Sequence, residues 1–195
     1  SRYQLLMREK TQKDVKKDLI SLINKNSCDI VFMGSFGRKS EKDDAERIGK
    51  TFEQVSLAVS IPVVAVKKFR RRAETSTQGY NFIICWDGHV PKTLKTTQAL
   101  AKNENDKIFG VHVNAHPHEL YATKRLWDQE VAKLGIKAEL TVIEMNKMTV
   151  DEALIAYINE NENKTFDFAL LGFNNSATHH FSLSGASLFF LMNKA

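Results

Sequence analysis

An internal repeat constrains the fold of this chain more than any other feature of its sequence. The segment DIVFMG, which begins at Asp29, recurs as DFALLG from Asp167, at an offset of 138 residues. The same offset pairs further residues without a gap: Thr11 with Thr149, Asp14 with Glu152, and Ile20 with Ile158. An ordered series of matches at one offset predicts two related structural units in a single chain.

Composition limits the class of protein. The 195 residues are 43% hydrophobic and 26% charged, with only 3 Pro and 9 Gly, which excludes disordered and fibrous chains. No apolar run approaches the ~20 residues of a membrane span, and the first residues are polar. The two cysteines, Cys28 and Cys85, are too few for a disulfide framework and fit a reducing compartment. We therefore expect a cytoplasmic protein with no membrane partner.

Apolar segments of strand and helix character alternate along the chain, which predicts an α/β fold with parallel sheets. We expect strands at 3–7, 30–33, 61–66, 82–86, 108–113, 138–143 and 168–171. Helices are expected from Thr11, over 51–59, 92–102 and 120–134, from Thr149, and over 187–192.

Several of these elements carry end signals. Thr11 with Asp14, and Thr149 with Glu152, have the spacing of an N-cap followed by an acid three residues later. Gly135 is placed to end the helix 120–134. The continuous apolar run 30–33 predicts a strand covered on both faces.

Motifs at the strand ends resemble the universal stress protein family, here as two tandem units. Asp87 closes the strand 82–86, and the pair His112-Val113 ends the next strand. The loop opening 33–37 and the segment 61–67 are also similar to the family's pattern. The resemblance implies a Rossmann-like (adenine nucleotide alpha hydrolase-like) fold with five parallel strands in the order 3-2-1-4-5.

This resemblance also implies a domain division. Residues 1–68 correspond to the C-terminal part of a first unit, 69–79 to a basic and polar linker, and 80–195 to a second unit that lacks its fifth strand. On this interpretation the missing strands come from a longer tandem protein or from another chain. The cations in 67–72 are interpreted as a solvated linker rather than a nucleic-acid face.

Each unit retains part of a nucleotide loop. Glycines let backbone N–H groups approach phosphate oxygens, and the helix that follows presents its positive N-terminal end. The candidate binding residues of the first unit are Gly34, Gly37, Gly49, Lys50 and Thr51. Those of the second unit are Asp87 for ribose, Val113 for adenine, and Gly172, Asn175 and Gly185 for phosphates, as the resemblance implies.

Both loops depart from the family's pattern. Lys50 stands where the first unit should have a hydroxyl residue. In the second unit, Asn175 replaces the second glycine and Ala186 replaces the hydroxyl residue. The sequence therefore leaves two states open: ATP or AMP bound with Mg²⁺, or loops that hold no nucleotide.

The functional expectation is a non-catalytic stress-response protein that senses, or formerly sensed, adenine nucleotides. We expect no catalytic residues and no metal site, since the histidines at 112, 116, 118, 179 and 180 are interpreted as strand or exposed loop residues. The resemblance implies a homo-oligomer, or pairing with another such unit, through the strand 61–66. A slow nucleotide hydrolase and a nucleotide-free structural scaffold remain as alternatives.

Overall fold

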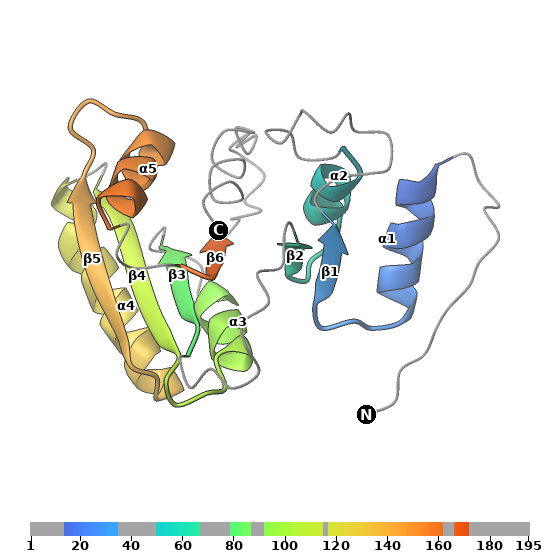
Figure 1. Ribbon diagram of the computed structural model, residues 1–195, viewed down its shortest axis with the longest axis horizontal. Helices are drawn as coiled ribbons and strands as arrows, with labels where there is room; N and C mark the ends of the chain where they lie inside the picture. The colour runs from blue at the N-terminus through green and yellow to red at the C-terminus, as the bar shows by residue number, and fades with distance from the viewer. Residues whose placement is uncertain are drawn as a thin grey trace. The chain divides into compact units, whose positions relative to one another are not determined.

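In the computed structural model the chain divides into two compact units, Ser1–Arg70 and Arg71–Ala195 (Figure 1). The structure describes residues 14–34, 50–66, 79–86, 92–114, 117–161 and 166–171. The strand expected at 3–7 and the helix expected at 187–192 lie outside these residues.

The first unit contains two helix–strand pairs. These are α1 (Val15–Lys25) with β1 (Val31–Gly34), and α2 (Lys50–Ala58) with β2 (Val63–Val66). The two strands are parallel neighbours, with Val31 beside Val63. Apolar side chains pack on one face of this small sheet, and the buried members of this cluster are Ile23 of α1, Val55 of α2 and Val59, which directly follows α2.

Two sequence expectations in this unit are wrong. Helix α1 begins at Val15, three residues later than expected, and Asp14 rather than Thr11 is its N-cap. The Asp14 carboxylate accepts a hydrogen bond of 3.2 Å from the Lys16 N–H, which satisfies one of the helix's unpaired donors. Within the described residues, the helices pack against one face of strand β1, and Phe32, on its other face, is 57% exposed.

The second unit is built on a four-stranded parallel sheet. Its strands are β3 (Asn81–Cys85), β4 (Lys107–Asn114), β5 (Ala138–Glu144) and β6 (Phe168–Leu171), in the order β5-β4-β3-β6. The α/β class and the parallel sheets are confirmed. Numbered within this unit from β3, these strands lie in the order 3-2-1-4, which is the order 3-2-1-4-5 implied by the resemblance without its fifth strand. The strands β1 and β2 of the first unit form a separate two-stranded sheet.

Helices cover both faces of this larger sheet (Figure 1). On one face lie α3 (Lys92–Leu100) and α4 (Leu120–Leu134), which follows a short 3-10 turn η1 (Pro117–Glu119). The cluster under them is formed by Phe82, Ile84, Trp86, Leu94, Ile108 and Trp127. On the opposite face lies α5 (Val150–Glu160).

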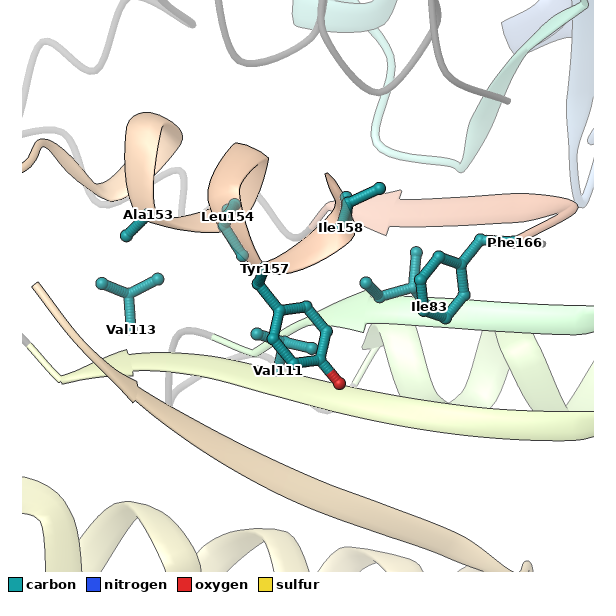
Figure 2. Close-up of a cluster of buried hydrophobic side chains, with 8 residues drawn as sticks. All are labelled: Ile83, Val111, Val113, Ala153, Leu154, Tyr157, Ile158 and Phe166. Atoms are coloured by element: carbon teal, nitrogen blue, oxygen red, sulfur yellow. The ribbon is translucent and has the colours of Figure 1, made fainter. Parts of the chain in front are cut away.

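Figure 2 shows the core beneath α5. Three side chains of α5 pack against Ile83 of β3 and Val111 of β4: Leu154, Tyr157 and Ile158. Successive residues of β3 and β4 thus belong to different clusters, as expected for strands buried on both faces.

The helix ends in this unit follow the sequence signals. Gly135 ends α4 with a left-handed φ of 63°, a conformation that costs glycine little. At the start of α5 the Thr149 hydroxyl accepts from the Glu152 N–H at 3.4 Å, and the Glu152 carboxylate accepts from the Thr149 N–H at 2.8 Å. Both predicted caps are therefore confirmed.

Candidate functional site

Ligands of open α/β sheets bind at the carboxyl ends of the parallel strands. Four of the candidate nucleotide-binding residues lie within the described part of the chain. Val113 is buried near the end of β4, with 8% of its surface exposed. In the first unit, Gly34 ends β1, and Lys50 and Thr51 begin α2. The remaining candidates lie outside the described residues: Gly37, Gly49, Asp87, Gly172, Asn175 and Gly185.

The His112 side chain of β4 forms a hydrogen bond to the backbone of Trp86, the residue that follows β3. The Nδ1 atom of His112 lies 2.8 Å from the carbonyl oxygen of Trp86, and the Trp86 N–H donates to the carbonyl of Val111 at 2.8 Å. Because a carbonyl oxygen only accepts, the proton of this His112 contact is on Nδ1. The backbone immediately before Asp87 is therefore held from two sides.

Asn114 and Glu144 form a polar pair where β4 and β5 end. They are direct partners in the parallel register, and the Asn114 Nδ2 donates to both carboxylate oxygens of Glu144, at 2.9 and 3.1 Å. Asn114 is buried, with 5% of its surface exposed. Its Oδ1 atom has no hydrogen-bond partner among the described residues, an unusual state for a buried polar atom.

Trp86 carries a second buried polar atom that has no hydrogen-bond partner among the described residues. Its ring meets that of Trp127 edge to face, with ring centroids 5.3 Å apart. Only 4% of the residue is exposed, and its Nε1 atom has no partner within the described part of the chain. The edge of the sheet thus contains one unpaired donor and one unpaired acceptor, neither of which the sequence motifs indicated.

Cys85, the last residue of β3, carries a thiol whose reactivity depends on its surroundings. Burial raises the pKa of the Cys85 thiol to about 12, so this sulfur is neutral at physiological pH and a poor nucleophile. His118 is exposed, and its Nε2 atom lies 3.5 Å from the Oε1 atom of Glu119. The histidines at 116, 179 and 180 lie outside the described residues. No group of three or more His, Cys, Asp or Glu residues in the described ranges is arranged to hold a metal ion.

None of the helices in the described residues is long and apolar enough to cross a bilayer.

Comparison with known proteins gives a structural likeness and no sequence match. No family model matches the chain, and no curated protein does. Among solved structures, the chain is similar to the crystal structure of a universal stress protein from Archaeoglobus fulgidus DSM 4304, with a TM-score of 0.62 and 16% sequence identity. The match covers 92% of this chain and 62% of that one. At this identity, the likeness shows a shared fold.

Proposed function

We propose that this chain is a non-catalytic stress-response protein of the universal stress protein type, built from tandem units, which binds an adenine nucleotide at the carboxyl edge of its four-stranded sheet. In this proposal Asp87 holds the ribose, the backbone at Val113 contacts adenine, and the loop with Gly172, Asn175 and Gly185 faces the phosphates. Mg²⁺ accompanies the phosphates.

The observation that carries the proposal is the construction of that edge. Val113 is the second-last residue of β4 and lies beside Ile143 of β5, and His112 and Val111 contact the backbone of Trp86, which precedes Asp87. A rigid backbone at a strand end lowers the entropy lost when a ligand binds. The fold shared with a universal stress protein supports the same function.

Isothermal titration calorimetry with MgATP and MgAMP tests the proposal directly. We expect saturable binding that Asp87→Ala weakens at least about tenfold, because one charge-assisted hydrogen bond contributes roughly 1.5–3 kcal/mol. Asp128→Ala is the matched control, since Asp128 is an exposed aspartate on α4. Binding that is lost in Gly34→Ala and kept in Asp87→Ala would instead assign the nucleotide to the first unit.

The proposal includes association through strand β2, the edge strand expected at 61–66. The Val31 N–H donates to the carbonyl of Pro62 at 2.9 Å. In a parallel ladder Val31 then pairs with Pro62 and Val64, and the N–H groups of Val63 and Ala65 face the other edge of β2. That edge has no strand partner among the described residues, and such edges pair readily with other strands.

Light scattering coupled to size-exclusion chromatography tests this association. Ala65→Pro removes an N–H from the outer edge while leaving the bonds to β1 in place, so we expect it to dissociate the oligomer. Ala65→Ser keeps the N–H and should associate like the unchanged protein. An oligomer that survives Ala65→Pro assembles through another surface.

Two other roles make distinct predictions for the same preparations. A structural scaffold would associate and bind no nucleotide, an outcome that Asn175 and Ala186 in the phosphate loop favour. A slow hydrolase would release phosphate from ATP above a heat-inactivated control, and Asp87→Ala would abolish that release. Native mass spectrometry of freshly purified protein reports retained nucleotide and copy number together.

A further inference from the structure

We propose that Asn114 selects the base of the nucleotide, favouring a 6-aminopurine such as adenine over a 6-oxopurine such as hypoxanthine or guanine. The inference rests on the proposed function, because it assigns base selectivity to the same edge of the sheet. It is carried by the buried Oδ1 atom of Asn114, which has no hydrogen-bond partner among the described residues.

The orientation of the Asn114 amide is fixed by its neighbour. An ionised carboxylate only accepts hydrogen bonds, so the Nδ2 of Asn114 must face Glu144, which it contacts at both oxygens. The Oδ1 atom then lies on the opposite side of the planar amide, away from β5. Glu144 is exposed whereas Asn114 is buried. The exposed Glu144 therefore determines that Oδ1, and not Nδ2, is the Asn114 atom left available to a ligand.

The Oδ1 atom lies at the strand end where the proposed function places the base. Asn114 directly follows Val113, whose backbone contacts adenine in that proposal, and the Asn114 side chain leaves the sheet on the face opposite to the Val113 side chain. A buried acceptor without a donor is costly, and a ligand that supplies an N–H recovers that cost. The 6-amino group of adenine is a donor, whereas a 6-oxo group is an acceptor and would face Oδ1 with like polarity.

A charge reversal at Glu144 gives the sharpest test. Lysine only donates, so in Glu144→Lys the amide should turn its Oδ1 toward Lys and present Nδ2 to the base. The exposed position makes the replacement compatible with folding. The matched control is Glu139→Lys, the same charge change on an exposed residue near the other end of β5.

The experiment measures binding of MgATP and MgITP, which differ at position 6 of the purine, by calorimetry on the full chain. We expect the unchanged protein and Glu139→Lys to bind ATP about tenfold or more tightly than ITP, and Glu144→Lys to lose or invert that preference. In Asn114→Leu, which removes the acceptor, the two affinities should become equal. Circular dichroism establishes that each variant is folded.

Each contrary outcome overturns the inference. If the unchanged protein binds ATP and ITP equally, nucleotide binding stands and Asn114 does not select the base; its Oδ1 is then satisfied by another donor, such as a buried water. A preference for ATP that persists in Glu144→Lys and in folded Asn114→Leu would likewise exclude Asn114 as the selecting residue. If no nucleotide binds, both the proposed function and the inference fail.

Discussion

Gly110 of β4 lies directly beneath the indole of Trp127 of α4. A Cβ atom built at Gly110 would approach Cζ2 of Trp127 to 2.6 Å, closer than real contacts allow. Trp127 is 1% exposed and belongs to the core beneath α3 and α4. The absence of a side chain at Gly110 is therefore what lets the indole of Trp127, which is almost completely buried, pack against the sheet.

Gly110→Ala should destabilise the second unit by about 1–3 kcal/mol, the usual cost of overpacking a core. Urea unfolding followed by circular dichroism measures the change. Combining Gly110→Ala with Trp127→Phe tests the cause, because the smaller ring vacates the space that the new methyl needs. The two substitutions should together cost less than the sum of their separate effects; simple additivity would show that Trp127 is not the obstacle.

Gly135 is required for a different reason. No atom lies within 4 Å of a Cβ built there, but its φ of 63° is left-handed. Gly135→Ala should therefore cost about 1 kcal/mol through backbone strain alone, whereas Gly135→Asn should cost less because asparagine tolerates this conformation. Thermal melting of the two variants compares them, and equal losses would point to a contact rather than to φ.

The capping box of α5 should contribute measurably to stability. Thr149→Ala removes the hydroxyl that accepts from the Glu152 N–H and is expected to cost about 1 kcal/mol. Thr149→Ser retains the hydroxyl and serves as the control. The midpoints of denaturant unfolding compare the stabilities of the two variants. If Thr149→Ser is as unstable as Thr149→Ala, the effect comes from the lost methyl group and not from the hydroxyl.

The Cys85 thiol predicts a pH dependence at the alkaline end. Its pKa is raised by burial from 9.0 to about 12, so between these values the unfolded chain loses a proton that the folded chain keeps. The free energy of unfolding should then fall as pH rises above about 9, by at most about 1.4 kcal/mol per pH unit from this group. The full contribution is present below pH 9.

The difference between the unchanged protein and Cys85→Ala isolates this effect from other titrations. We expect their stabilities to converge as pH rises from 9 toward 11 in urea unfolding experiments. Parallel curves would mean that the thiol is not desolvated. As an independent check, a thiol reagent at pH 8 should react with Cys85 only after unfolding.

The sequence predicted the parts of the fold that depend on local signals. Gly135 and Thr149 each carry a backbone requirement that few other residues meet, so the ends of α4 and α5 could be placed. The start of α1 could not, because Thr11 and Asp14 are both good N-cap residues three positions apart, and local pattern does not decide between them. The structure places the cap at Asp14.

Features that depend on cross-strand register were beyond the sequence. Asn114 and Glu144 are 30 residues apart and meet only because β4 and β5 align in one particular register. The available signal was that each is the polar residue that ends an apolar strand. Likewise, the apolar run around Phe32 predicted burial on both faces, but hydrophobicity alone does not state whether a second layer covers the strand.

The order of the strands has a consequence for how the second unit is made on the ribosome. Strand β3 is central, yet its two neighbours are synthesised at very different times: β4 comes next, while β6 arrives last of the described strands. The Asp167 carboxylate then accepts from the Asn81 N–H at 2.8 Å, and the Asp167 N–H donates back to the Asn81 carbonyl at 2.8 Å, across 86 residues of chain. Until β6 has been synthesised, the edge of β3 opposite β4 lacks this strand partner. We therefore expect nascent chains that stop before Asp167 to be the form most prone to chaperone binding and to aggregation.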